Sequence, residues 1–250
     1  MELAAFAAWC FLVAFAGGLV GLVLGNLRLP ATLLFASSAA AGGGANLAIS
    51  AIAALTAAVV HIRAGRINWR LVGWMAPPSI AGAMVGGYAA GAIPEALLLG
   101  FITLVLLQSG ISLLRRPPAP SPPADAPQPE LDVRAALVSG AVIGVLGGLV
   151  GLILGSLRMP ALLRWVGETP QRAVGSNVTV GVLVGVAGAL AHLPNAAPDL
   201  DAILVGGAAS VPGALLGSRL TGRLSEAQLV RAIGFVLLIA AAATGTQALT

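Results

Sequence analysis

Charged residues are scarce in this chain, which has 250 residues of which 9% are charged and 58% are hydrophobic. Soluble domains carry roughly 25% charged residues, so the composition excludes a soluble globular protein. The single cysteine, Cys10, excludes an intrachain disulfide framework and any metal site built from several cysteines. The composition therefore predicts an integral membrane protein with membrane lipid as a partner.

Catalytic motifs are also missing. The sequence has no nucleophile beside a base, no H-E-x-x-H metal motif and no G-x-x-x-x-G-K phosphate loop. We therefore expect no enzyme, no metal and no cofactor. The formal net charge of +4 reflects basic residues in short loops between apolar stretches. That pattern is typical of membrane proteins, and we expect no nucleic-acid partner.

What the chain does contain is a duplication. The 15-residue segment that begins at Gly17 returns at Gly147 with 12 identical positions, at a spacing of 130. The match continues at a spacing of 131, where Asn46 pairs with Asn177 and Glu95 with Glu226. Repeats of this length are typical of the two halves of a transporter.

The duplication divides the chain into two membrane repeats and a linker. Residues 1–114 form the first repeat, 115–134 a proline-rich cytoplasmic linker and 135–250 the second repeat. Each repeat has four apolar runs, but the second run, 29–60 or 160–193, is too long for one span of about 20 residues.

Loop charges predict that the two repeats have opposite orientations in the membrane. The loop at 63–70 is basic and the one at 94–95 is not, whereas residues 194–201 are acidic and 219–231 are basic. Basic loops stay in the cytoplasm, so equivalent loops lie on opposite sides. Inversion needs an odd number of crossings per repeat, either five or three plus a re-entrant hairpin.

The predicted fold is therefore an all-α membrane protein with two inverted repeats, discontinuous or re-entrant helices and about 8–10 membrane helical segments. The helix breaks are expected at 25–30 and at the glycines 42–44, with equivalents in the second repeat. Pro30 and Pro160 would then stand in the first turn of a helix. Glu95 and Glu226 are expected to start helices.

Two arginines stand at equivalent positions inside apolar segments, Arg28 and Arg158. A charge at the bilayer centre costs about 2.5–3.5 kcal/mol on insertion scales, so each needs compensation. An anion at a broken helix start would supply it, helped by close backbone approach at Gly25 and Gly155. The alternative is that both side chains reach the lipid headgroups from a hairpin tip.

A second polar pair, Asn46 and Asn177, suits the hydrogen bonds that an oxyanion accepts. The other candidates are hydroxyl donors beside these residues and glycines that leave backbone N–H groups open, namely Ser176, Thr179, Gly44 and Gly175. The alternative is ordinary hydrogen bonding between membrane helices. His61 and His192 end apolar runs beside polar loops, and we expect both at the membrane interface.

Several segments resemble the TauE/SafE family of sulfite and organosulfonate exporters. They are the stretch 169–177, the loop 65–70, the helix 82–86 followed by Pro94 and Glu95, and the glycine-rich segments that close on Pro30 and Pro160. The resemblance implies export of sulfite, a sulfonate such as sulfoacetate, or a related sulfur oxyanion. The paired arginines and asparagines give an independent reason to expect a small anion.

We therefore predict a secondary transporter that exports small anions by alternating access. A passive anion channel or a structural membrane subunit without transport remains the alternative. The expected location is the cytoplasmic (inner) membrane, taken as that of a bacterium. The sequence leaves the oligomeric state open, with a homodimer as the working assumption.

The inverted topology can be tested by labelling engineered cysteines at Ala64 and Ala197, in a background in which Cys10 is replaced. We expect the two positions to react from opposite sides of the membrane, because they lie in equivalent loops of inverted repeats. The same model places Arg115, Arg116 and Arg134 inside, with Met1 and Thr250 outside. Reaction of both cysteines from one side would rule the inversion out.

Overall fold

The computed structural model describes residues 2–35, 39–89, 94–115, 131–150, 153–192 and 199–249. Within these ranges the chain forms ten α-helices and no strands, with five helices in each half. The first half contains α1 (Glu2–Val20), α2 (Gly25–Phe35), α3 (Ala39–Arg63), α4 (Trp69–Tyr88) and α5 (Glu95–Arg115). The second half contains α6 (Val133–Val150), α7 (Gly155–Arg164), α8 (Pro170–His192), α9 (Leu200–Thr221) and α10 (Glu226–Leu249).

Five helical segments of the described chain are long and apolar enough to cross a bilayer. They are α1, residues 44–63 of α3, residues 96–115 of α5, α9 and residues 226–248 of α10. The all-α fold expected from the sequence is confirmed. The spans are those that an integral membrane protein requires.

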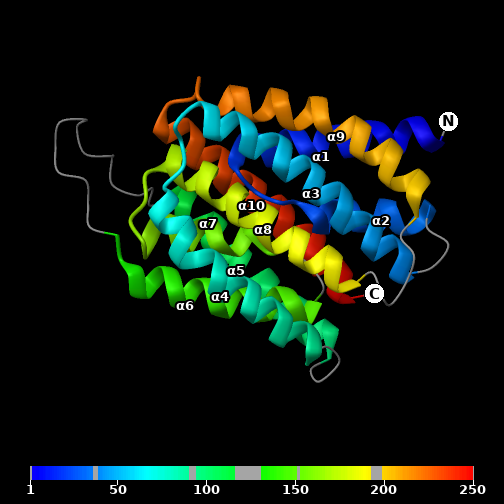
Figure 1. The fold of residues 1–250 in the computed structure, drawn as a ribbon, viewed down its shortest axis with the longest axis horizontal. Coiled ribbons are helices and arrows are strands. Elements are labelled where there is room, and N and C mark those ends of the chain that lie inside the picture. The colour runs from blue at the N-terminus through cyan, green and yellow to red at the C-terminus, as the bar shows by residue number, and fades with distance from the viewer. Residues whose placement is uncertain are drawn as a thin grey trace.

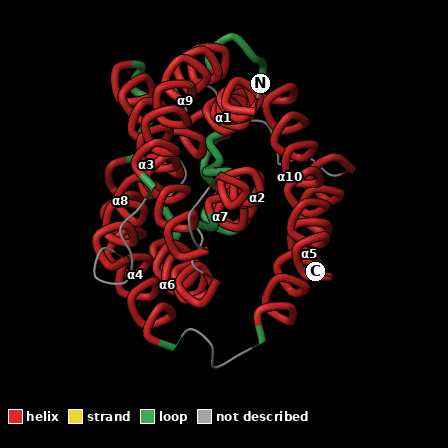
Figure 2. The backbone as a smooth tube through the Cα atoms, turned by 90° about the vertical axis from the view of Figure 1, so that its right-hand side faces the viewer, coloured by secondary structure: helices red, strands yellow, loops and turns green. Residues whose placement is uncertain are grey.

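The helices lie roughly along one long axis, and the two short ones occupy the middle. Viewed along that axis, α2 and α7 lie inside a ring formed by the other helices (Figure 2). In the side view α2 and α7 lie on opposite sides of the centre (Figure 1). The equivalent helices α1 and α6 start from opposite ends of the molecule (Figure 1).

Helix packing repeats when the two halves are exchanged. The α1·α9 interface has its counterpart in α4·α6, and α3·α9 has its counterpart in α4·α8. The α3·α8 and α5·α10 interfaces join equivalent helices of the two halves. The duplication in sequence is therefore also a duplication of helix contacts.

The two largest interfaces are closed by equivalent glycines. A Cβ atom at Gly86 in α4 would collide with the backbone carbonyl of Val145 in α6. A Cβ atom at Gly217 in α9 would collide with the carbonyl of Phe15 in α1. Each glycine belongs to a Gly-x-x-x-Gly pair, the spacing that lets helix backbones approach closely in membranes.

The first helix break lies before the position expected from the sequence. α1 ends in a Schellman turn, in which Gly21 has a φ of 68° and the Leu22 N–H donates to the Gly17 carbonyl at 2.9 Å. Residues 22–24 then run without helical structure to Gly25, where α2 begins. The prediction of a turn at 25–30 is therefore wrong, because these residues are helical.

Pro30 and Pro160 accordingly lie inside their helices, in α2 and α7, instead of in the first turn. A proline has no N–H to bond the carbonyl four residues earlier. In α2 that carbonyl belongs to Asn26, and it accepts a hydrogen bond from Gln247 Nε2 of α10 at 2.9 Å. A contact with a distant helix therefore satisfies the carbonyl that the proline leaves free in α2.

The glycines at 42–44 are also not a break, because α3 already begins at Ala39 and includes them. Gly175 likewise lies within α8, where a Cβ atom would collide with the Arg66 carbonyl of the α3–α4 loop. Its small size allows another segment to approach α8 closely. Glycine can serve close packing as well as chain reversal, and the sequence does not separate these uses.

Other boundaries follow the sequence. α5 starts at Glu95 and α10 at Glu226, as predicted. α5 ends at Arg115 and α6 starts at Val133, while linker residues 116–130 lie outside the described residues.

Replacing Gly86 or Gly217 with alanine should destabilise the protein by about 1–3 kcal/mol, the usual penalty for overpacking a tight interface. The thermal unfolding midpoint in detergent is the measurement. Gly100→Ala in α5 is the matched control, since nothing lies within 4 Å of its Cβ position. Alanine there should be neutral or stabilising through helix propensity. Equal midpoints for all three variants would contradict the role given to Gly86 and Gly217.

Candidate functional site

Equivalent asparagines hold the starts of the two central helices. Asn46 Nδ2 on α3 donates to the Gly25 carbonyl at the start of α2, at 3.1 Å. Asn177 Nδ2 on α8 donates to the Gly155 carbonyl at the start of α7, at 2.9 Å. Both side chains are buried, so these bonds fix the two helix starts inside the bundle.

Asn177 also joins the two breaks to each other. Its Nδ2 donates a second bond to the Gly21 carbonyl at 2.7 Å, at the end of α1. A Cβ atom on Gly155 would lie 3.2 Å from the Val23 backbone nitrogen, so the start of α7 packs against the α1–α2 connection. The two breaks therefore form one central region.

Arg28 and Arg158 lie within this region, in α2 and α7. Each residue is only 2% exposed, so protein encloses the side chains and they do not extend toward headgroups. Arg28 Nη1 donates to Ser50 Oγ on α3 at 3.1 Å, while Arg28 Nε has no hydrogen-bond partner among the described residues. Arg158 has two such unpartnered atoms, Nε and Nη1.

The difference between the two arginines follows from one substitution between the repeats. Ser50 of α3 corresponds to Gly181 of α8 at the repeat spacing of 131. A glycine offers no hydroxyl, so Arg158 lacks the bond that Arg28 makes. The unpartnered N–H groups of Arg158 are available to a ligand.

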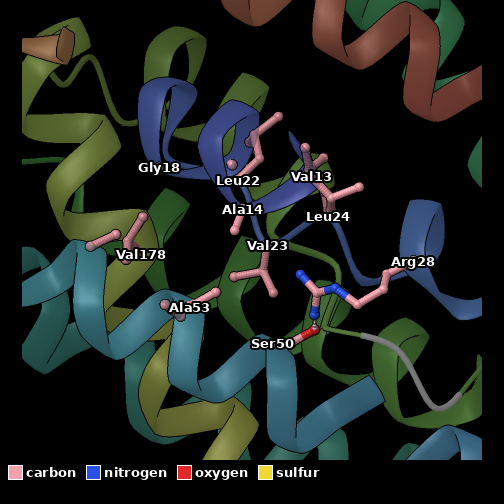
Figure 3. A pocket seen from close by; sticks show the side chains of 13 residues that line it. Val13, Ala14, Gly18, Leu22, Val23, Leu24, Arg28, Ser50, Ala53 and Val178 are labelled. Atoms are coloured by element: carbon pink, nitrogen blue, oxygen red, sulfur yellow. Dashed lines mark hydrogen bonds between the residues drawn. The ribbon is translucent and has the colours of Figure 1, made fainter. Parts of the chain in front are cut away.

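A small cavity opens beside Arg28. Its volume is about 20 Å³, and it lies between α1, the α1–α2 connection, α3 and Val178 of α8. Arg28 and Ser50 are its polar groups, and the remaining lining is apolar or glycine (Figure 3). The Arg28 guanidinium reaches from α2 toward Ser50 beside Val23 and Leu24 (Figure 3).

Two of the expected hydroxyl donors are engaged elsewhere. Ser176 Oγ accepts a 2.9 Å hydrogen bond from the Asn68 backbone N–H and so anchors the α3–α4 loop to α8. Thr179 Oγ1 donates to the Gly175 carbonyl within α8 at 2.9 Å. Gly44 lies half-buried in α3, two residues before Asn46. The structure therefore brings together the asparagines, Gly25 and Gly155, with Arg28 and Arg158 in the first turns of the two helices, but not these hydroxyls.

His61 has a more enclosed environment than expected. It lies in the last turn of α3 but is completely buried, because α8 packs against it: a Cβ atom on Gly175 would lie 3.2 Å from the His61 Cβ. His61 therefore lies at the end of a span beside a loop, as expected, but its side chain is enclosed by protein. The side chain of His192 lies outside the described residues.

The break in the first repeat has polar support that sequence reasoning missed. Asn26 Nδ2 donates to Thr244 Oγ1 of α10 at 3.0 Å, next to the bond from Gln247 described above. The equivalent of Asn26 is Ser156, and that of Thr244 is Leu113. The sequence signal for this contact was that Asn26 and Thr244 differ from their equivalents in the second repeat. The Asn26–Thr244 hydrogen bond holds α2 to α10, and α7 and α5 cannot form the same bond because Leu113 has no hydroxyl.

Comparison with known proteins assigns the chain to a family. The model of the family described as "Sulfite exporter TauE/SafE" matches residues 6–244, nearly the whole chain. The chain belongs to the TauE/SafE family. This confirms the resemblance seen in the sequence and identifies a membrane protein of a transporter family rather than an enzyme family. Neither a curated protein nor a solved structure matches this TauE/SafE chain significantly.

The joining role of Asn177 predicts an unequal effect of two equivalent substitutions. Asn177→Leu removes the bonds to the Gly21 and Gly155 carbonyls, whereas Asn46→Leu removes only the bond to the Gly25 carbonyl. Each lost buried hydrogen bond should cost about 1–2 kcal/mol. Asn177→Leu should therefore lower the thermal unfolding midpoint about twice as far as Asn46→Leu, and equal shifts would contradict the joining role.

Proposed function

We propose that this protein is a secondary transporter that exports sulfite or organosulfonates, such as sulfoacetate, across the cytoplasmic membrane by alternating access. The observation that carries the proposal is the pair of buried arginines at two helix starts in the middle of the bundle. Membership of the TauE/SafE family supplies the substrate class.

The charge of the central region favours an anion. Arg28 and Arg158 bring two positive charges, and neither has a carboxylate partner among the described residues. Both lie in the first turn of a helix, where free N–H groups and the helix dipole also favour negative charge. An anion bound there would offset the cost of burying two guanidinium groups in a membrane.

The charges at the two ends of the molecule support one orientation. The arginines at helix ends and in loops gather at the end where α3 joins α4, α5 ends, α6 starts and α9 joins α10 (Figure 1). They are Arg63, Arg66, Arg70, Arg115, Arg134, Arg164, Arg172, Arg219, Arg223 and Arg231. The opposite end carries Glu2, Glu95, Asp199 and Asp201. By the positive-inside rule the arginine end faces the cytoplasm, which agrees with inverted repeats that have an odd number of crossings each.

Occlusion of the site favours alternating access over a passive channel. A cavity of about 20 Å³ holds roughly one water, which is too small for a sulfur oxyanion. Both arginines are closed from solvent at either end. Substrate must therefore enter through a change of conformation, and rocking of one repeat against the other around a central site would provide it.

Anion binding to the purified protein in nanodiscs tests the proposal. Titration with sulfite, sulfoacetate, sulfate and chloride should show saturable binding of a sulfur oxyanion. Arg28→Gln or Arg158→Gln should weaken that binding about 10–100-fold, the value of a charge-assisted hydrogen bond. Arg63→Gln is the matched control, because Arg63 is exposed at the end of α3 and should leave binding unchanged.

Binding that survives loss of both central arginines would place the site elsewhere. Flux in proteoliposomes separates the remaining alternatives. A transporter saturates with substrate concentration, whereas a channel does not, and a structural subunit shows no flux.

A further inference from the structure

The two helix breaks contain buried acceptors as well as buried donors without partners. In α2 and α7 the unpartnered donors are Arg28 Nε together with Arg158 Nε and Nη1, and in α3 the two ring nitrogens of buried His61 are also without a partner among the described residues. The unpartnered acceptors are Asn46 Oδ1 and Asn177 Oδ1, which occupy equivalent positions in the repeats. Buried polar groups are almost always paired, so both kinds of atom call for a ligand.

The orientation of each asparagine amide is fixed by its neighbours. Asn46 donates to the Gly25 carbonyl, and Asn177 donates to those of Gly21 and Gly155. A carbonyl oxygen can only accept, so the amide nitrogen must face it. Turning either amide round would place two oxygens together. The free atom is therefore an acceptor in both repeats.

The amide of Asn46 and the hydroxyl that holds Arg28 both lie beside Gly25 in the first break. A Cβ atom on Gly25 would lie 3.1 Å from Ser50 Oγ, which holds Arg28, and 3.2 Å from Asn46 Nδ2. In the second break a Cβ atom on Gly155 would lie 3.5 Å from Asn177 Nδ2, and Arg158 follows in the same turn of α7. The duplication thus places a guanidinium and an amide oxygen at each helix start.

This combination distinguishes between ligands. A fully ionised oxyanion would satisfy the arginines but leave both amide oxygens unpaired and facing negative charge. A cation would satisfy the amide oxygens but would lie beside two guanidinium groups. An oxyanion that keeps one proton accepts from arginine and donates to asparagine, so it satisfies both.

We propose that the site takes its oxyanion in the singly protonated form, hydrogen sulfite in its O–H form, with oxygens on the arginines and the O–H on Asn46 or Asn177. The inference rests on the proposed anion transport and names the species carried. Each transported sulfite then carries one proton and a single negative charge. The membrane potential therefore acts on one charge per ion instead of two.

Ionisable neighbours are few around these breaks. The Cys10 thiol of α1 interacts electrostatically with Arg28, and no such neighbour is resolved for Arg158. Among the residues that line the cavity, Arg28 of α2 is the charged one. His61 on α3 is buried beside the end of α1, where it interacts with the Gly18 backbone and with Arg66. A change in binding with pH could therefore come from Cys10, from His61 or from the ligand.

The test is binding of sulfite and methanesulfonate to the wild-type protein in nanodiscs across neutral to alkaline pH. Sulfite loses its last proton in this range, whereas methanesulfonate stays ionised and has no proton to give. The apparent Kd for total sulfite should rise about tenfold per pH unit once sulfite is mostly deprotonated, because only the protonated fraction binds. Methanesulfonate should bind more weakly than sulfite at the neutral end of the range, and its Kd should not change with pH.

Three results would overturn the inference. A sulfite Kd that is independent of pH means that the dianion binds and that water fills the gap beside the asparagines. Parallel changes for both ligands mean that a protein group such as Cys10 titrates. Absence of binding by either ligand at every pH removes the anion site itself, and with it the proposed function.

Asn46→Leu and Asn177→Leu provide a second measurement. Each removes one amide acceptor at similar size, so in at least one of them the preference for sulfite over methanesulfonate at neutral pH should fall about tenfold, equivalent to one lost hydrogen bond. Ser139→Ala is the matched control, because Ser139 is buried in α6 and donates within its own helix to Ala135. An unchanged preference in both variants, each of them folded, would overturn the inference. If neither variant folds, the wild-type pH series still decides.

Discussion

The hydrogen bonds from Asn46 and Asn177 to the first carbonyls of α2 and α7 are the constraint on which the central region depends. A helix start inside an apolar bundle keeps its position only where contacts from neighbouring elements fix it. The two amides supply such contacts from long helices packed around the centre. They thereby place the first turns of α2 and α7, with Arg28 and Arg158, away from both ends of the bundle.

Duplication explains why the centre has two similar halves, and divergence explains why the halves differ. Both repeats keep the asparagine, the glycine and the arginine. Only the first has Ser50, and only its break is held to α10 through Asn26. Arg158 keeps two free N–H atoms, while Arg28 is already held by a hydroxyl. The repeats therefore offer a ligand one guanidinium that is already hydrogen-bonded, Arg28, and one with two free N–H groups, Arg158. The helix interfaces around them are otherwise equivalent in the two halves.

Burial of the site links its chemistry to its mechanism. Two enclosed guanidinium groups and two free amide oxygens are costly in an apolar bundle, and a bound ion of matching chemistry would offset that cost. The same enclosure prevents an ion from entering without movement of the helices. Equivalent glycines let α4 lie against α6 and α9 against α1 as backbone-to-backbone contacts around this centre.

The sequence by itself determined the membrane class, the duplication and the family, because these depend on composition and spacing that no packing can alter. It also singled out Arg28, Arg158, Asn46 and Asn177, because a polar residue inside an apolar run is costly and its presence at the same position in both repeats indicates a shared role. Only the tertiary structure decided where the helices break, because the carbonyl freed by Pro30 is bonded by Gln247, more than 200 residues away. It likewise decided that Ser176 anchors a loop, that Gly175 serves close packing and that His61 is enclosed. Each of these outcomes depends on a contact between distant segments, which local sequence cannot specify.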